Sequence, residues 1–383
     1  MKRIRLKESM MQLRNCVVDS DFEYAKCDLC DEDNNEVKEL MFVQDNLGNK
    51  PGIFRIVECK NCHLVYLNPR PRQNAINKYY SAEYECHLIS GEDKKGLKYS
   101  VKNLIRAYQP GYYKGGQNRI KKLILTTISN IFEKRIAIVV PFIKGGKILD
   151  IGCGAGGFLN WMKSYGWHTY GCDINNTACE RARARGLDIF WGQLEEAKYP
   201  DEFFDVITMN DVMEHLPGPS RVLCECNRIL KKDGLLIMNV PNFDCFERKI
   251  FKENWYHLDA PRHLYHFSVS TLKSILGKNG FHIEKYKFKP LFPLYDKISL
   301  KYVRKNHPLT KFRKICLFFH ILLLKPLKYA LSFNHPEQFS INITVYLRKI
   351  VKPVRELQYL FEVSSSQKCL PNEAKRSLNC SGS

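Results

Sequence analysis

One segment, residues 147–158, limits most strongly what this chain can fold into. It reads KILDIGCGAGGF, in which apolar residues on both sides of Asp150 indicate a buried strand. Glycines follow at alternate positions: Gly152, Gly154 and Gly156. Glycine lets the chain turn tightly and lets a ligand approach the backbone, and the apolar residues after the turn indicate a helix whose first N–H groups face it. The segment therefore predicts a site for a nucleotide-type cofactor.

The glycine pattern alone leaves two cofactor classes open. Gly152, Gly154 and Gly157 also match the G-x-G-x-x-G spacing of dinucleotide-binding folds. Asp150 would place a carboxylate beside a pyrophosphate, which argues against that class. The next strand ends in Asp173, which suits a ribose diol in either class. Strands and helices then alternate, which predicts a doubly wound α/β fold.

Four motifs in series carry a family resemblance: ILDIGCGAGG at 148–157, GCDI at 171–174, FDVITMNDVMEHLP at 204–217 and the strand at 230–238. Together they resemble class I S-adenosylmethionine-dependent methyltransferases, in particular the branch that includes the ubiquinone-biosynthesis O-methyltransferases. The resemblance implies a mostly parallel, seven-stranded, Rossmann-like sheet within residues 146–350. It also implies an antiparallel last strand, for which the alternating residues 341–348 are the candidate.

The resemblance implies cofactor contacts along this series. The loop from Gly152 to Gly156 would lie against the methionine and ribose, and Asp150 would hold the amino group directly or through water. Asp173 would accept both ribose hydroxyls. Further contacts fall on Ile174, Gln193, Leu194 and Asn210. At the adenine these families often carry an acidic residue, and this chain has a glutamine there, so Glu195 is an alternative.

Two histidines are candidates for the chemistry. His263 lies in the histidine-rich segment 254–268, which the resemblance places over the substrate pocket, and it is the first choice for general base or substrate anchor. His215 lies four residues after Asp211, about one helical turn, and is the second candidate. A packing role stays open for both. Ser268 is expected to cap the helix that follows.

Cysteines near the N-terminus pair at metal-ligand spacing. They form two C-x-x-C knuckles: Cys27, Cys30, Cys59 and Cys62. Two such knuckles can give four thiolates to one tetrahedral Zn²⁺. The 28 residues between them exceed the common spacing of about 15–20. Residues 39–43 and 53–57 around a glycine-containing turn, however, predict a hairpin that joins the knuckles, so we expect a zinc-ribbon-like module within residues 1–85.

A second resemblance concerns the residues after this module. Residues 64–72 and 79–84 resemble a stretch often found in bacterial methyltransferases with an N-terminal cysteine-rich module. Many of those proteins act in sugar, surface-polysaccharide or natural-product pathways. This resemblance indicates which branch of the family the chain is similar to, but it gives less information about the substrate.

Composition limits the number of domains, the cellular location and the kind of binding partner less closely than the motifs do. With 383 residues and 44% hydrophobic content, the chain can form about two or three domains. Fifteen cysteines show no secreted disulfide framework, and no apolar run follows the basic N-terminus, so we expect a cytoplasmic location. Of the net charge of +20, residues 285–328 contribute twelve Lys or Arg against one acidic residue. Such a block suits nucleic acid, an anionic membrane or a phosphorylated substrate, and a merely solvated surface stays open.

An apolar run, residues 315–324, lies inside this basic block. It is too short to span a bilayer, which takes about 20 apolar residues, and cations flank it on both sides. The pattern predicts that residues 311–328 dock on an anionic membrane, with a subunit interface or core helix as the alternative. The other expected segments are a linker with lead-in helices (86–145), a basic and apolar insertion (285–335), and a C-terminal helix with a disordered tail (351–383).

We expect an S-adenosylmethionine-dependent methyltransferase acting on an oxygen of a sugar, a polysaccharide precursor or another small polar metabolite, lipid-linked if the membrane prediction holds. An RNA methyltransferase is the alternative, because a zinc ribbon and a basic surface suit RNA. No Asn-Pro-Pro-Tyr-type motif of base methylation follows the fourth strand, which counts against it. A non-enzymatic, membrane-attached protein of the same fold is the third hypothesis, and the intact glycine turn and Asp173 count against that one. The oligomeric state stays open.

Overall fold

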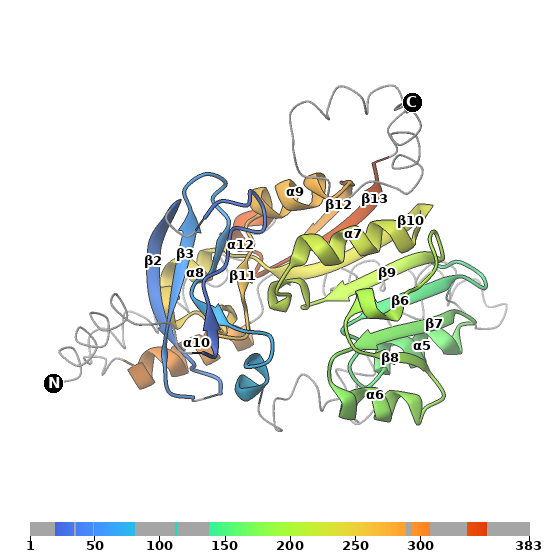
Figure 1. Ribbon diagram of the computed structural model, residues 1–383, viewed down its shortest axis with the longest axis horizontal. Coiled ribbons are helices and arrows are strands. Elements are labelled where there is room, and N and C mark those ends of the chain that lie inside the picture. Colours follow the sequence, from blue (N-terminus) through green and yellow to red (C-terminus); the bar gives the residue numbers. More distant parts are fainter. Residues whose placement is uncertain are drawn as a thin grey trace, which may run out of the picture.

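The computed structural model describes residues 20–33, 36–48, 50–80, 112, 138–288, 293–306 and 335–350. Of the linker and lead-in helices expected at 86–145, the structure describes residue 112 and residues 138–145, and the latter form no helix. The rest of that segment, the run at 311–328 and the segment after residue 350 lie outside the described residues. Two sheets lie side by side, a blue one near the N-terminus and a larger one that runs from green to red (Figure 1).

The larger sheet has seven strands in the order β12-β13-β10-β9-β6-β7-β8. The five strands from β10 to β8 pair in parallel, whereas β13 runs antiparallel between β10 and β12. Their bounds are β6 (Lys147–Ile151), β7 (His168–Asp173), β8 (Asp188–Trp191), β9 (Phe204–Asn210), β10 (Leu230–Pro241), β12 (Phe281–Phe288) and β13 (Asn342–Lys349). The sheet confirms the mostly parallel, seven-stranded fold predicted from the sequence, including its antiparallel last strand.

Helices cover both faces of this sheet, which explains the apolar runs of its central strands β6, β9 and β10. They are α5 (Gly157–Ser164), α6 (Asn176–Arg183), α7 (Pro219–Ile229) and α9 (Val269–Lys278). Consecutive residues of β6 face opposite cores, because Ile148 packs in the cluster with α5 and α6 and Leu149 in the cluster with α7 and α9. Asn175 caps α6 and Ser268 caps α9, each accepting a backbone N–H, the second as predicted.

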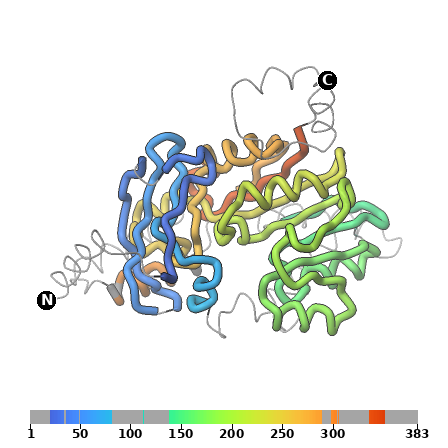
Figure 2. Tube along the Cα trace, in the orientation of Figure 1, coloured from blue at the N-terminus to red at the C-terminus, as the bar shows by residue number. Residues whose placement is uncertain are grey.

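The second sheet combines the cysteine-rich module with a strand from far along the chain. Its order is β11-β4-β3-β2. The bounds are β2 (Val37–Gln44), β3 (Ile53–Cys59), β4 (Val65–Leu67) and β11 (Tyr265–His266). The β2–β3 hairpin is antiparallel, which confirms the prediction. β11 pairs with β4 and places Tyr265 opposite Tyr66, so the histidine-rich segment belongs to the sheet of the module, as the adjacent blue and orange traces in Figure 2 show.

Short elements complete the described residues: β1 (Phe22–Glu23), β5 (Arg70–Pro71), η2 (Ile76–Tyr79), η3 (Leu194–Ala197), η4 (Met213–His215), α8 (Phe246–Phe251), η5 (Lys252–Asn254), η6 (Tyr256–Leu258), α10 (Pro293–Asn306) and α12 (Pro336–Phe339). The first residues of the expected basic insertion, 285–288, belong to β12. Across the described ranges, no helix has both the length and the apolar character needed to cross a bilayer.

Candidate functional site

The carboxyl ends of three neighbouring strands meet at one edge of the large sheet. β7, β6 and β9 are adjacent and parallel, so they bring Asp173, Asp150 and Asn210 to the same edge. The chain proceeds from β6 outward to β8 and then returns to β9 on the other side of β6. Open α/β sheets bind ligands in the crevice where the strand order reverses in this way. The predicted cofactor residues therefore converge where such a fold binds its ligand.

The glycine turn after β6 leaves room beside its backbone at one position. Gly154 has a φ of +53°, and a Cβ added to it would meet no atom within 4 Å. Gly152, with a φ of +70°, has no such room, because a Cβ would lie 2.4 Å from Val212 Cγ2. Gly156 is closed off in the same way by a leucine side chain 2.4 Å away, so it serves packing where α5 begins. The surface open to a ligand lies at Gly154.

The buried Asp173 carboxylate is held from both sides. Oδ2 accepts from Gly154 N and Oδ1 accepts from Asn175 N, both at 2.8 Å. A carboxylate offers about four acceptor sites, so each oxygen retains one for a further donor. Two hydroxyls on adjacent carbons match this pair of acceptors. The residues present therefore fit the ribose of S-adenosylmethionine.

Asp150 places a second buried carboxylate at this edge. Thr208 of β9 donates its hydroxyl to Asp150 Oδ1 at 2.6 Å and so fixes the side chain. A charge in a site of low dielectric strongly favours an opposite charge beside it. The ammonium of S-adenosylmethionine fits this position, and the pyrophosphate of a dinucleotide does not.

The predicted adenine contacts have different environments. Leu194 is buried in the core, whereas the Gln193 side chain caps η3 and accepts from Arg221. Glu195 pairs with Arg221 through Oε1 at 2.7 Å. Its Oε2 is buried and has no hydrogen-bond partner within the described ranges. Glu195 therefore has one oxygen in an ion pair and the other buried, and its contact with adenine stays a prediction.

An exposed apolar pair lies beside these residues. Ile174 is 57% exposed directly after Asp173, and Trp191, at the end of β8, is 53% exposed. Trp191 Nε1 donates to the Ile174 carbonyl at 3.1 Å, which holds the two residues together. Such a surface can pack against a flat purine ring. Ile174 is among the residues predicted from the sequence, and Trp191 is not, although an aromatic residue at the end of the third strand was a usable signal.

Asn210 ends β9 in an exposed position, and its amide donates to Asp211 Oδ2 at 2.9 Å. Asp211 has a φ of +55° and accepts a second hydrogen bond from Asn239 of β10 at 2.6 Å. These contacts fix the turn that leads from β9 into η4. The turn thereby joins the edge of the sheet that carries the predicted cofactor residues to the segment that carries the histidine candidates.

One carboxyl and two imidazole side chains lie together beyond this turn. Ligand atoms of Glu214, His215 and His263 all lie within 4.8 Å of one another. The two imidazole rings meet edge to face, with their centroids 4.5 Å apart. Leu264 N donates to Glu214 O at 2.7 Å and joins the two segments. The structure brings both predicted histidines together and adds Glu214, which directly precedes His215 and was not predicted.

Hydrogen bonds fix the orientation of both histidine rings. His215 Nδ1 lies 3.0 Å from the Arg262 carbonyl, and His263 Nδ1 lies 2.9 Å from the His257 carbonyl. A carbonyl oxygen only accepts, so each Nδ1 carries the hydrogen and each Nε2 carries the lone pair. Burial lowers the pKa of His263 to about 4, so its ring is neutral at pH 7. Both rings can therefore offer a lone pair to a proton or a cation.

Glu214 is 1% exposed, and neither carboxylate oxygen has a hydrogen-bond partner among the described residues. Burial, and then the nearby charge of Asp211, raise the pKa of this carboxyl well above its usual range. One carboxylate and two imidazoles form a donor set typical of divalent cations such as Zn²⁺. A metal–ligand distance of about 2.1 Å keeps two ligand atoms within about 4.2 Å, so cation binding would require only a small contraction of the cluster.

The four cysteines of the N-terminal module converge on one point. The sulfurs of Cys27 and Cys62 are 3.4 Å apart and those of Cys30 and Cys59 are 3.5 Å apart. The two knuckles share one backbone conformation: Asp31 N and His63 N each donate to the carbonyl of the first cysteine, with φ values of +60° and +63°. Tetrahedral Zn–S bonds of about 2.3 Å place sulfurs about 3.8 Å apart, close to these distances. The residues present fit a zinc ion.

Known proteins resemble this chain over its central part. Residues 122–286 match a family model described as a methyltransferase domain. A ubiquinone biosynthesis O-methyltransferase of Maricaulis maris is 34% identical over 173 residues, which cover 42% of this chain and 68% of that protein. A protein of the same name from Glaesserella parasuis is 33% identical over 109 residues, and the chain spans less than half of it, 46%, with 26% of its own length.

Solved structures are also among the similar proteins. The crystal structure of a SAM-dependent methyltransferase from Archaeoglobus fulgidus is 20% identical, covers 60% of this chain and 94% of that protein, and has a TM-score of 0.38. The residues matched by the family model, 122–286, include the glycine turn, the carboxyl edge of the sheet and the cluster of Glu214, His215 and His263. This chain belongs to the family of S-adenosylmethionine-dependent methyltransferases.

Proposed function

We propose that this methyltransferase modifies a hydroxyl oxygen of a small polar metabolite, with a sugar or a polysaccharide precursor as the first choice. The observation that carries the proposal is the cluster of buried Glu214 and His263 with half-buried His215, joined to the edge that holds the predicted cofactor residues. A hydroxyl is a weak nucleophile until its proton is taken or held. A buried group of proton acceptors supplies that function.

The cofactor supplies an activated methyl group on a sulfonium, so the chain has to place the acceptor oxygen in line with that group. Asp173 would hold the ribose and Asp150 the ammonium. The neutral His263 ring, with its lone pair on Nε2, would receive the hydroxyl proton. Asp259 Oδ2 lies 3.9 Å from His263 Nε2 and would stabilise the imidazolium that forms.

The environment of Glu214 supports a divalent cation within the same cluster. Both of its oxygens are buried without a hydrogen-bond partner in the described part of the chain, which raises the pKa of the carboxyl, so its ionised form would need a compensating charge such as a bound cation. A cation there would take the Nε2 lone pairs of the histidines, and it would acidify the acceptor hydroxyl in place of proton transfer to His263. Titration with Mn²⁺ of protein that carries one zinc per chain, on its cysteines, followed by electron paramagnetic resonance, should show one site that Glu214→Gln removes. A wild type that binds no Mn²⁺ would leave the histidines to act alone.

The names of the relatives support oxygen as the acceptor, since both are O-methyltransferases of ubiquinone biosynthesis. The resemblance of residues 64–72 and 79–84 to methyltransferases of sugar and polysaccharide pathways supports the choice among hydroxyl compounds. The RNA alternative rests on the zinc ribbon and on the basic surface, and residues 289–292 and 307–328 of the basic block lie outside the described residues.

Two further proposals concern binding. Zinc on Cys27, Cys30, Cys59 and Cys62 is supported by the sulfur distances and the matched knuckles. Docking of residues 311–328 on an anionic membrane, in a cytoplasmic protein, would deliver a lipid-linked acceptor to the site.

A methyl-transfer assay tests the acceptor class. The full chain is incubated with methyl-labelled S-adenosylmethionine and, separately, with nucleotide sugars and glycans, with phenolic metabolites and with tRNA. Label in a sugar methyl ether supports the proposal, and label in tRNA alone refutes it. His263→Ala should abolish labelling in every pool while S-adenosylhomocysteine binds with unchanged affinity.

A further inference from the structure

One buried side chain joins the cysteine-rich module to the histidine-rich segment. Arg262 is 0% exposed, and all five N–H groups of its guanidinium are used. Its Nη2 donates to Asp45 Oδ1 at 2.7 Å and to Asp259 Oδ1 at 2.5 Å, while Nη1 donates to the Tyr79 carbonyl at 3.0 Å. Arg262 thus has two carboxylate partners, one of them in the module.

Asp45 lies in the turn between β2 and β3. Its Oδ1 also accepts from Gly48 N at 2.7 Å and its Oδ2 from Lys50 N at 3.2 Å, so one carboxylate orders the turn and binds Arg262. A Cβ at Gly48 would lie 2.5 Å from Asp45 Oδ2 and 2.9 Å from Arg262 Nη1. The turn therefore lies directly against the ion pair.

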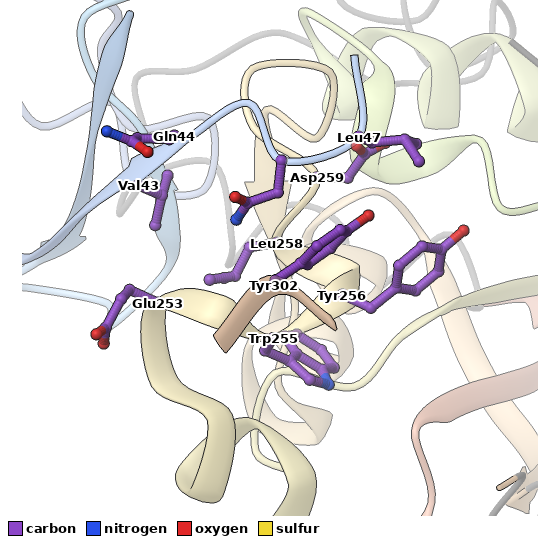
Figure 3. Close-up of a pocket in the computed structure, with 10 residues that line it drawn as sticks. Val43, Gln44, Leu47, Glu253, Trp255, Tyr256, Leu258, Asp259 and Tyr302 are labelled. Atoms are coloured by element: carbon purple, nitrogen blue, oxygen red, sulfur yellow. The ribbon is translucent and has the colours of Figure 1, made fainter. Parts of the chain in front are cut away.

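The turn and the histidine-rich segment also share a small pocket beside this pair. Figure 3 shows Val43 and Gln44, at the end of β2, and Leu47 of the turn lining the same pocket as Leu258 and Asp259 of the segment. The two parts of the chain are thus in contact over several residues, with the Arg262 ion pair as the charged link between them.

The backbone of Arg262 faces the catalytic candidates. Its carbonyl accepts from His215 Nδ1 at 3.0 Å. Arg262 N and His263 N both donate to the Asp259 carbonyl, at 2.9 and 3.1 Å. The hydroxyl of Tyr80, the residue after the carbonyl that Arg262 binds, lies 3.1 Å from the same His215 nitrogen. The contacts that orient both rings are therefore fixed by the segment that Arg262 anchors.

We propose that Arg262 is a positioning residue, through which the β2–β3 turn of the cysteine-rich module sets the orientation of His215 and His263. The inference rests on the proposed function of these two histidines. A buried ion pair is weak evidence for stability, because well-packed apolar residues hold two elements together equally well. The Arg262 ion pair does more than hold the two elements together. Its planar guanidinium fixes the orientation of both carboxylates that it contacts.

Nitrogen-15 spectra of histidine side chains test this proposal in the full, zinc-loaded chain, because they distinguish a hydrogen on Nδ1 from one on Nε2. The wild type should show His215 and His263 as Nδ1–H tautomers. Asp45→Asn, which retains the size of the side chain and removes its charge, should shift or mix the tautomers of these two rings. The exposed His168 and His282 should give unchanged signals.

The matched control is Asp28→Asn. Asp28 also joins the module to the methyltransferase part, because its Oδ2 accepts from Ser220 N at 2.8 Å where α7 begins, but it lies on a different contact. This variant should leave all histidine signals unchanged. Equal changes in both variants would mean general loosening and overturn the proposal, as would unchanged His215 and His263 signals in folded Asp45→Asn. If Asp45→Asn does not fold, Gly48→Ala presses on the same ion pair without removing either charge, and the same two outcomes decide.

Activity separates this proposal from the proposed function. With the acceptor found by the transfer assay, kcat of Asp45→Asn should fall about tenfold or more, the effect of a small misplacement of catalytic groups, with S-adenosylhomocysteine affinity unchanged. A wild type that transfers no methyl group to any hydroxyl refutes the proposed function. An active wild type whose kcat and histidine signals survive Asp45→Asn refutes the positioning role alone.

Discussion

The cofactor end of the site depends on Asp173, whose two oxygens are each held by one backbone N–H. Asp173→Ala should remove two charge-assisted hydrogen bonds to the ribose, worth about 1.5–3 kcal/mol each, and lower S-adenosylhomocysteine affinity at least about 100-fold. Calorimetry measures the change. Asp188→Ala, at the exposed start of β8, is the control and should bind normally. Equal affinities for the two variants would contradict the assignment.

The burial of His266 makes the folded state sensitive to acid. Burial, and then the charge of Arg248, lower its pKa to about 3, whereas an unfolded histidine titrates near 6.5. Between these values the unfolded chain binds more protons than the folded one. The stabilisation from keeping His266 neutral is therefore fully present above pH 6.5 and is lost as pH falls toward 3.

His266→Phe isolates this effect. The His266 ring lies 5.4 Å from the Phe243 ring, and phenylalanine retains an aromatic ring there without a titrating group. Urea unfolding between pH 4 and 6 should show a slope of the unfolding free energy that is lower than the wild-type slope by up to about 1.4 kcal/mol per pH unit. Comparing slopes removes any constant packing penalty. Identical slopes would show that His266 does not titrate on unfolding.

Among the larger elements, the paired knuckles lead to a metal prediction. The purified protein should contain about one zinc per chain, because four thiolates in this arrangement bind the ion tetrahedrally. Elemental analysis should find the zinc lost in Cys59→Ser and retained in Cys245→Ser, a buried free cysteine outside the cluster. Full zinc content in Cys59→Ser would rule out the proposed ligand set.

The segment 311–328, outside the described residues, leads to a membrane prediction. Apolar burial combined with charge attraction should make the full chain float with anionic liposomes at low salt and less so at high salt. Replacing Lys311, Arg313 and Lys314 by glutamine should weaken flotation while the apolar run stays intact. Equal recovery with neutral and anionic vesicles rejects the electrostatic part. No flotation together with a dimeric native protein would favour a subunit interface.

Local patterns explain which elements could be predicted from the sequence. The glycine turn, the β2–β3 hairpin and the cap at Ser268 are each specified by residues a few positions apart. β11 has only two residues and no pattern of its own, and its partner β4 lies far away in the chain. The Arg262–Asp45 pair joins residues 217 positions apart. Contacts of that kind follow from tertiary packing, so no spacing in the sequence could reveal them.

The same distinction holds within the site. Asp150, Asp173 and the glycine turn could be assigned because they follow strands in a known order. His215 and His263 could be named singly, but their contact edge to face with Glu214 appears only in the folded chain.

Taken as one protein, the chain is a methyltransferase sheet and a cysteine-rich module that share β11 and the Arg262 ion pair. This arrangement places the catalytic candidates between the two parts, so we expect both parts to be needed for transfer.

Methyl transfer by His263→Gln, compared with the wild type and with the acceptor found by the transfer assay, tests whether the cofactor edge and the histidine cluster form one active site. The variant should bind S-adenosylhomocysteine with wild-type affinity and lose about 10²–10⁴-fold in transfer rate, the usual loss when a general base is removed. A folded His263→Gln that transfers the methyl group at the wild-type rate would contradict the account.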